Sequence, residues 1–298
     1  MRITEFMTDT TFRRQVREAR GEMVKFNEQI ATGKRVRKGS DDSVAFTSGK
    51  LFEDLIRRNE QFQRNADNGL FQARTVQDSL SRMEDLLSTM KARAIEAGND
   101  TKSADERESL ANQFESMRDE LLNISSTKYN GLHVFSGTAS DAPPFERDAG
   151  AAGGVATLST DRPLKVMVGD ASVINTTITG VELRDTRAGD MFEIIQNTID
   201  ALRANDGPQI RDSIENLDET VNHVVGLSTR IANNINRLEY TNQRLGDNII
   251  DQKGEVSRLV DADIIDSMLN FKNAQTSYDA ILSSQSRMMQ TSLLDYLR

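Results

Sequence analysis

The chain has 298 residues, of which 37% are hydrophobic and 28% are charged, and its formal net charge is −9 at pH 7. This surplus of negative charge repels a phosphate backbone, so we expect no nucleic-acid partner. The absence of cysteine excludes disulfide frameworks and thiol chemistry. The start "MRITEFMTDTTFRRQ" has no apolar h-region and no run of about 18 apolar residues occurs, so the sequence supports neither a cleaved signal peptide nor a membrane span.

An amphipathic helix is expected at the N-terminal end, from about residue 12 to residue 30. Its apolar side chains recur in alternating steps of four and three, which average the 3.5-residue period of a coiled-coil seam. They are Phe12, Val16, Ala19, Met23, Phe26 and Ile30. The pattern indicates a helix that needs a partner helix.

The stretch "IATGKRVRKGSDD", residues 30–42, interrupts this periodicity. Two glycines, Gly33 and Gly39, stand among basic residues, and the stretch ends on Asp41 and Asp42. The two aspartates suit the first turn of a following helix, because carboxylates there face its unpaired N–H groups. We interpret the stretch as a hinge between two helices, in which the charges are solvated or contact another protein.

A second, longer helix is expected to follow the hinge, because the same alternating steps run from Ala45 to Ala94. After "EAGNDTKSADE", Ser103 and Glu106 form the sequence pattern of a capping box. This box precedes a third helix, whose apolar residues run from Leu110 to Ile124.

The helical periodicity is lost in the middle of the chain. Tyr129-Asn130-Gly131 is typical of a hairpin turn, and "LKVMV" and "SVINTTITGVEL" are rich in β-branched residues. We therefore expect a small β-rich insert over residues 136–188.

Helical patterns resume near Asp190 and continue to the C-terminal end. The longest seam begins at Ile210 and ends at Leu259, with polar residues at Ser228, Asn242 and Gln252. A helix with such a seam is expected to lie antiparallel to the long helix of the N-terminal half. After residues 261–263 a last helix carries Ile264, Met268, Phe271, Tyr278, Leu282 and Met289 in a related register.

The expected fold class is mainly α, a long antiparallel helical hairpin or bundle with coiled-coil-like terminal helices and a small β-rich insert. We expect three parts: residues 1–40 with 262–298, residues 41–135 with 189–261, and residues 136–188. The terminal helices are expected to be mobile in the monomer and to become ordered on assembly, because an isolated helix with a narrow seam is marginally stable in water.

No constellation of residues suggests catalysis or cofactor binding. The sequence has no glycine-rich phosphate loop with the required spacing, and its two histidines, His133 and His223, lie in different segments. Asp261 and Asp263 diverge by about 200° on a helix, which does not suit a paired-carboxylate site. We expect a chain that is not an enzyme and that holds neither a cofactor nor a metal.

Four phrases of the sequence resemble the flagellin superfamily of bacterial flagella. They are "TGKR" at 32–35, "SDD" at 40–42, "STRIANNINRLE" at 228–239 and "DADI" at 261–264. The opening "MRIT", the stretch "IATGKRVRKGSDD" and the ending "SLLDYLR" are more similar to the hook–filament junction proteins of this superfamily than to flagellin itself. The resemblance covers the helical segments on both sides of the insert.

The resemblance implies an extracellular structural component of the flagellum, located at the hook–filament junction and exported by the flagellar secretion system. The implied partners are a neighbouring hook-associated protein on the hook side and flagellin on the filament side. Self-association in a ring and an export chaperone at the C-terminal helix are also implied.

The resemblance further implies that the terminal helices pair in an inner tube. The implied interface residues are Phe12, Val16, Met23, Phe26, Ile30, Met268, Phe271, Tyr278, Leu282 and Met289, and the implied hinge residues are Gly33, Lys34, Arg35, Gly39, Asp41 and Asp42. Gly33 and Gly39 would let the chain turn, and the hinge charges would meet neighbouring subunits. On this hypothesis Lys34→Glu with Arg35→Glu weakens assembly and leaves the monomer folded.

Two other functions are compatible with the helical pattern. A short, divergent flagellin that forms the filament itself would carry similar ends and a small insert. A coiled-coil adhesin or another helical interaction protein would show the same seams, but it would normally carry a membrane span or a signal segment.

Overall fold

The computed structural model describes the backbone of residues 2–99 and 101–296 and the side chains of residues 9–99 and 101–287. The chain forms two compact units. Unit 1 consists of the residues up to Arg58 and those from Asn248 onward, and unit 2 consists of residues Asn59–Asp247. The expected division into three parts stays a prediction.

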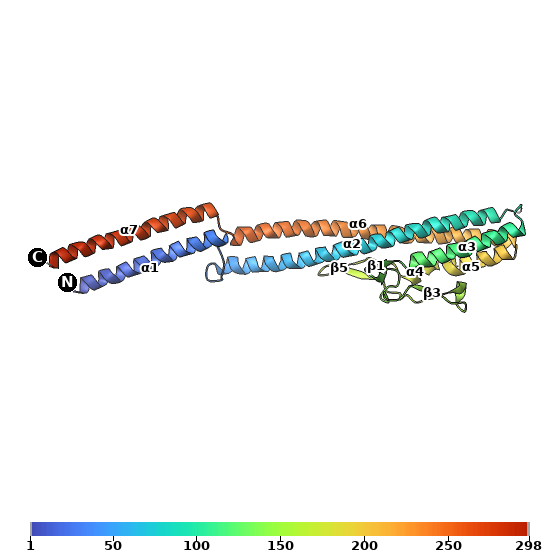
Figure 1. Ribbon diagram of the computed structural model, residues 1–298, viewed down its shortest axis with the longest axis horizontal. Coiled ribbons are helices and arrows are strands. Elements are labelled where there is room, and N and C mark those ends of the chain that lie inside the picture. The colour runs from blue at the N-terminus through green and yellow to red at the C-terminus, as the bar shows by residue number, and fades with distance from the viewer. Residues whose placement is uncertain (1, 100, 297–298) are drawn as a thin grey trace. The chain divides into compact units, whose positions relative to one another are not determined.

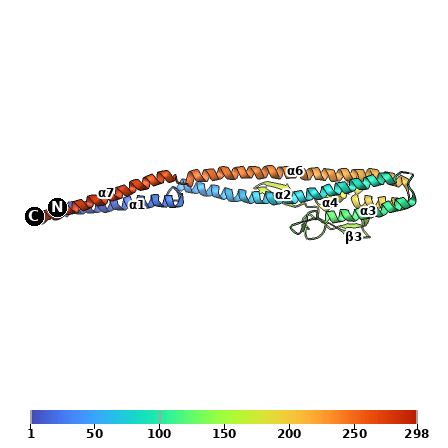
Figure 2. The ribbon, with the colours of Figure 1, turned by 45° about the horizontal axis from the view of Figure 1, so that its top comes forward.

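Unit 1 is built from two helix pairs. Helix α1 (Arg2–Thr32) and helix α7 (Ile264–Tyr296) lie side by side, drawn in blue and red in Figures 1 and 2. The first turns of α2 (Ser43–Ala97) and the last turns of α6 (Gly207–Val260) form the second pair. The mobility expected for the terminal helices in the monomer stays a prediction.

In unit 2, α2 and α6 run antiparallel along a buried seam (Figure 1). The α2 side of the seam includes Leu80, Leu87 and Met90, and the α6 side includes Leu217 and Val224, all fully buried. The 4-3 spacing of these residues keeps one stripe of each helix turned toward the other. The expected antiparallel pairing is therefore present.

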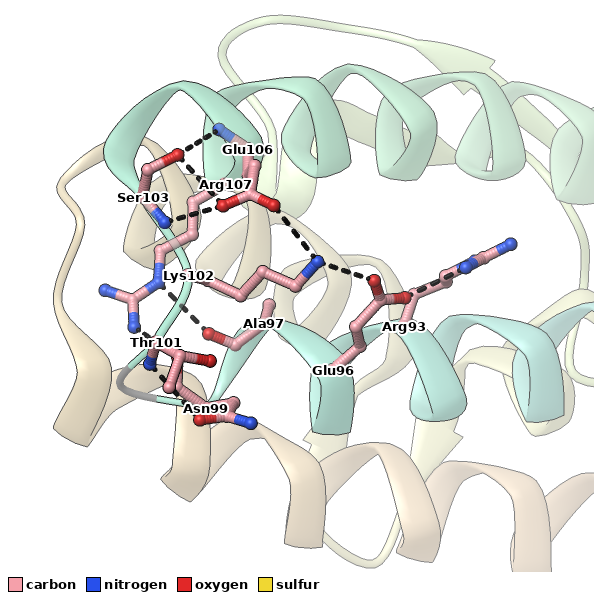
Figure 3. Close-up of polar contacts among 9 residues, drawn as sticks. All are labelled: Arg93, Glu96, Ala97, Asn99, Thr101, Lys102, Ser103, Glu106 and Arg107. Carbon is pink, nitrogen blue, oxygen red and sulfur yellow. Dashed lines mark hydrogen bonds and ion pairs between the residues drawn. The ribbon is translucent and has the colours of Figure 1, made fainter.

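Two shorter helices, α3 (Ala104–Ser125) and α5 (Met191–Arg203), pack against each other beside the seam (Figure 1). The expected capping box begins α3: the Glu106 N–H donates to Ser103 Oγ, and the Ser103 N–H donates to the Glu106 carboxylate. Lys102 lies between the carboxylates of Glu96 and Glu106, as Figure 3 shows. Its hydrogen bonds to Glu96 and then to Glu106 raise the pKa of Lys102 above its usual range.

Arg107 of α3 binds the C-terminal ends of α2 and α5. Its side chain is only 5% exposed, and it donates to the carbonyl oxygens of Ala97 at 3.0 Å and Asn99 at 3.1 Å and to the Asn205 side chain (Figure 3 shows the Ala97 and Asn99 bonds). Carbonyl groups at helix C-termini carry partial negative charge, so they suit a buried guanidinium.

The named strands among the described residues form short antiparallel pairs, which lie within the expected insert of residues 136–188 or directly beside it. The pairs are β1 (Lys128–Tyr129) with β2 (Leu132–His133), β3 (Phe145–Arg147) with β4 (Val155–Thr157), β5 (Lys165–Gly169) with β6 (Ser172–Asn175), and β7 (Asp185–Thr186) with β8 (Gly189–Asp190). A 3₁₀ turn η1 (Ala152–Gly154) and helix α4 (Gly180–Arg184) complete it. The mainly α fold class is confirmed.

The hairpin turn expected at Asn130-Gly131 joins β1 to β2, and both residues have positive φ, 50° and 83°. His133 follows in β2, with its side chain buried and Nδ1 without a hydrogen-bond partner. Burial, together with the nearby charge of Lys128, lowers the pKa of His133 below its usual range.

The insert is attached to both long helices of unit 2. On the α2 side, Asn65 donates to the Met167 carbonyl at 3.1 Å. On the α6 side, Arg230 pairs with Glu182 at 3.0 Å, and a ring nitrogen of His223 lies 2.8 Å from the Glu182 carbonyl oxygen. His133 is therefore buried beside the turn, and His223 contacts the backbone of the insert.

None of the described helices has an apolar stretch long enough to cross a membrane.

Candidate functional site

The hinge in unit 1 is a paired structure, not a free linker. Lys34 and Asp261 form an antiparallel β-bridge. The N–H groups of Arg35 and Val36 donate to the Val260 carbonyl at 2.8 and 3.1 Å, and the Ala262 N–H donates to the Gly33 carbonyl at 2.9 Å. We call residues 33–36 and 259–262 the clasp, because the two segments are held by their main chains.

Side chains add to the clasp. Lys34 Nζ lies 2.6 Å from Asp261 Oδ1, and the Arg35 guanidinium donates to the Leu259 carbonyl at 2.7 Å. The hydrogen bond from Lys34 lowers the pKa of Asp261 below its usual range. Because both partners of the ion pair are well exposed, the pair itself contributes little stability, and the main-chain bonds determine the geometry.

An apolar contact lies beneath the clasp. Val36 is 2% exposed, and it lines a small cavity together with Phe46, Gly49 and Val260. A Cβ atom at Gly49 would stand 2.6 Å from Val260 Cγ2. Only glycine therefore allows α2 and α6 to approach this closely next to the clasp.

The two aspartates of the hinge accept main-chain hydrogen bonds. Asp41 accepts from the N–H groups of Arg37 at 3.1 Å and Lys38 at 3.2 Å, and Asp42 accepts from the Ala45 N–H at 3.0 Å, at the start of α2. These bonds lower the pKa of both carboxyl groups below the usual range. Both aspartates precede α2, which begins at Ser43, so the expectation that they lie in its first turn is wrong; Asp42 instead caps the helix by accepting from the Ala45 N–H.

The two glycines of the hinge differ. Gly33 has φ = +67°, a conformation that strongly favours glycine, whereas Gly39 is not among the residues with positive φ. The chain turns at Gly33.

Three of the four basic side chains of the hinge already have partners in their own chain. Lys34 pairs with Asp261, Arg35 lies 3.5 Å from Asp42, and Arg37 pairs with Glu28 at 2.8 Å. A contact of these charges with a neighbouring subunit would need to replace these bonds. The double substitution of Lys34 and Arg35 therefore also tests the clasp and does not isolate a contact between subunits.

The α1 half of the expected interface lies on one face. All five of its residues are half-buried: Phe12, Val16, Met23, Phe26 and Ile30. Ala19, in the same stripe, is buried. Phe12 lines a shared cavity with Ala280 and Ile281 of α7. The stripe is therefore the side of α1 that packs on α7.

The α7 half is divided. Phe271 and Tyr278 are half-buried, but Met268 is 54% exposed and Leu282 is 41% exposed. The side chain of Met289 lies outside the described residues. The covered face of α7 runs through Ser267, Phe271, Ala274, Tyr278, Ile281 and Gln285. Sequence reasoning missed Ala274 and Ile281, because polar residues at both ends of this stripe hide its regular 4-3 spacing.

The start of α7 carries a second apolar face that the described residues of the chain leave open. It comprises Ile264, Ile265, Met268 and Leu269, and Ile265 is 81% and Leu269 60% exposed. We call these four residues the outer face of α7. Contiguous exposed apolar side chains of this kind mark surfaces that other molecules cover.

The chemistry available to the site is that of packing and charge pairing. Among the described residues, no three His, Cys, Asp or Glu side chains gather where they could hold a metal ion. The site can hold two chain segments together and present an apolar surface beside them.

Comparisons with known proteins agree with this architecture. Residues 3–140 match the family described as the bacterial flagellin N-terminal helical region. Flagellar hook-associated protein 3 of Escherichia coli is 25% identical over 299 residues, which cover 94% of each chain. Its namesake from Salmonella typhimurium is 25% identical over 268 residues, covering 83% of this chain and 84% of the relative.

A solved structure shares the fold. The structure described as a putative flagellar hook-associated protein from Vibrio parahaemolyticus has a TM-score of 0.67 and 19% identity, and the match covers 74% of this chain and all of the other. This chain is therefore similar to the bacterial flagellin N-terminal helical region over residues 3–140, and over most of its length it is similar to flagellar hook-associated protein 3.

Proposed function

We propose that this chain is a structural component of the bacterial flagellum, an adaptor that connects the hook to the flagellin filament by subunit packing. The observation that carries the proposal is the similarity to flagellar hook-associated protein 3 over 94% of both chains. The same similarity favours the junction role over the alternative of a short flagellin that forms the filament. The role is structural and not catalytic.

The assembly surface in this proposal is in unit 1. The outer face of α7 supplies apolar area, and Asp263 and Asp266 stand at its edge. Burying that area against another subunit removes apolar surface from water, which is the main favourable term in protein association. The proposal includes self-association in a ring, with a hook-associated protein on one side and flagellin on the other.

The α1–α7 pair is the proposed inner layer of the assembly. Phe12, Val16 and Phe26 would hold α1 on α7, while the outer face of α7 would contact neighbouring subunits. The clasp would set the direction in which both helices leave α2 and α6. The export route through the flagellar secretion system and a chaperone that covers α7 before export belong to the same proposal.

Electron microscopy of cells that lack this gene, with an assay of flagellin in the medium, tests the role. Hooks without filaments, and flagellin released as monomer, are expected. Absence of flagellin from both the cell surface and the medium would instead make this chain the filament subunit. Normal filaments would contradict both functions.

Complementation of the deleted cells tests the surface. Ile265→Glu places a charge in the centre of the outer face, whereas the control Ser277→Glu places the same charge on an exposed polar position of the same helix. Both proteins are expected in the medium, but only the control is expected to restore filaments. Equal filament numbers with the two variants would show that the outer face does not take part in assembly.

A further inference from the structure

Four polar pairs cross the apolar seam between α2 and α6 inside unit 2. Gln77 donates to Ser228 at 2.6 Å, and Arg74 pairs with Glu239 at 2.8 Å. Asn242 donates to Asp67, and Lys91 pairs with Asp218. Gln77 and Ser228 are partly buried at the seam, where an apolar pair of the same size would bury more apolar surface, whereas Arg74 and Glu239 are exposed at its edge.

The polar pairs are incompletely satisfied. Gln77 Oε1 and Asn242 Oδ1 are both buried without a hydrogen-bond partner. A buried oxygen without a partner costs free energy, so maximal stability does not explain these residues. Another property of the seam must depend on them.

Apolar burial alone does not determine the register in which α2 and α6 pair. Both stripes repeat in steps of three and four, so a slide by seven residues returns apolar side chains to apolar surroundings. Such a slide moves one helix by about 10 Å along the other, at 1.5 Å per residue. The same slide separates the two members of each polar pair.

A slide in one direction brings each α2 residue opposite the α6 residue seven positions earlier. Like charges then face each other in two places: Lys91 and Arg211, and Glu84 and Asp218. Both juxtapositions are repulsive, whereas the observed alignment pairs Arg74 with Glu239 and Lys91 with Asp218.

A slide in the other direction brings each α2 residue opposite the α6 residue seven positions later. Gln77 would then face Ile235, Lys91 would face Val225, and Arg74 would face Gly246. The three side chains lose their partners, and the Gln77 amide is placed against an aliphatic side chain, where its desolvation is uncompensated.

We propose that the four polar pairs select a single register between α2 and α6 and exclude the two alignments displaced by seven residues. The seam gives up some stability for this selection, as the two unpaired amide oxygens indicate. The selection concerns unit 2 alone and does not depend on the junction role.

Pulsed electron–electron distance measurements test the proposal, because the chain has no cysteine of its own. Asp78→Cys on α2 and Glu215→Cys on α6, both exposed, would carry the spin labels. A slide by seven residues changes their axial separation by about 10 Å. The labelled protein without further changes is expected to give one distance.

The first test variant removes all four pairs with Asp67→Ala, Arg74→Ala, Gln77→Leu, Lys91→Ala, Asp218→Ala, Ser228→Ala, Glu239→Ala and Asn242→Ala. A second distance, displaced by up to about 10 Å, is expected, with helical circular dichroism retained. The matched control exchanges one pair, Arg74→Glu with Glu239→Arg, and is expected to keep the single distance. A single native distance in the first variant would overturn the proposal and assign the register to the insert and the loops.

A second variant decides the matter if the first does not fold. Glu84→Lys and Arg211→Glu convert both repulsive juxtapositions of the first slide into attractive ones, while all four polar pairs of the native register remain. The fraction of molecules that show the displaced distance is expected to be larger than in the labelled control protein. If the native distance alone is found, charge does not select the register.

Discussion

The two helix pairs of this chain, α1 with α7 in unit 1 and α2 with α6 in unit 2, bury their seams to different extents. The α1 stripe is mostly half-buried, and α7 leaves a second apolar face open. In unit 2 the seam residues of α2 from Ala73 to Ala94 are buried, and those of α6 alternate between buried and partly buried, with α3, α5 and the insert packed beside them. The chain buries the core of unit 2 by itself and leaves apolar side chains of α7 exposed in unit 1.

The largest expected effect is a difference in the free energy of unfolding that is lost when a seam residue is truncated in α2–α6 or in α1–α7. Leu87→Ala in unit 2 is expected to lower the free energy of unfolding by about 2–5 kcal/mol, because a fully buried leucine leaves a cavity. Phe26→Ala in unit 1 is expected to cost about 1 kcal/mol, since its side chain is only half-buried. Urea unfolding followed by circular dichroism measures both. Equal costs would contradict the comparison.

A smaller effect is expected at the turn of the clasp. Gly33→Ala places a Cβ on a residue with φ = +67°, which costs about 1–2 kcal/mol. Trypsin is then expected to cleave after Lys34 and Arg35 several-fold faster than in the unmodified chain. Gly39→Ala is the control, because an added Cβ there meets only Phe46 at an ordinary 3.8 Å. Faster cleavage in the control as well would mean that both glycines are needed.

The smallest effect is expected on acidification. The folded-state pKa of Asp261 is lowered by Lys34, so its contribution is fully present above the ordinary carboxyl pKa of about 4 and is lost as the pH falls through the lowered value. The amide signals of Lys34 and Ala262 in ¹⁵N–¹H spectra are expected to shift in that range. In Asp261→Asn this titration is expected to disappear, and its persistence would assign it to Asp41 or Asp42.

The sequence predicted the features that follow from local periodicity. The long seams, the capping box at Ser103 and the Asn130-Gly131 turn depend on residues close together in the chain, and the structure contains all three. The face of α7 was harder to predict, since Met268 and Leu282 match the apolar spacing while the covered stripe begins at a serine. Which of two neighbouring stripes is covered depends on α1.

The clasp could not be predicted from the sequence, although its residues were singled out. Its main-chain bonds join residues 33–36 to residues 259–262, and hydrogen bonds of the backbone leave no trace in residue type. Gly49 gave no signal either, because its role depends on the approach of Val260 from the other end of the chain. The basic residues suggested a contact between subunits, while the structure shows partners for Lys34 and Arg35 within the chain.

Arg107 imposes an order on folding. Its guanidinium donates to groups 10 residues away at Ala97 and 98 residues away at Asn205. While the N-terminal half is alone, this cation has only some of its acceptors, and the seam of α2 lacks α6, whose Asp218 lies 127 residues from Lys91. Contacts of such long range form late and slowly, because a long loop must close first. The helices of the N-terminal half therefore become a stable unit only when the C-terminal half returns to them.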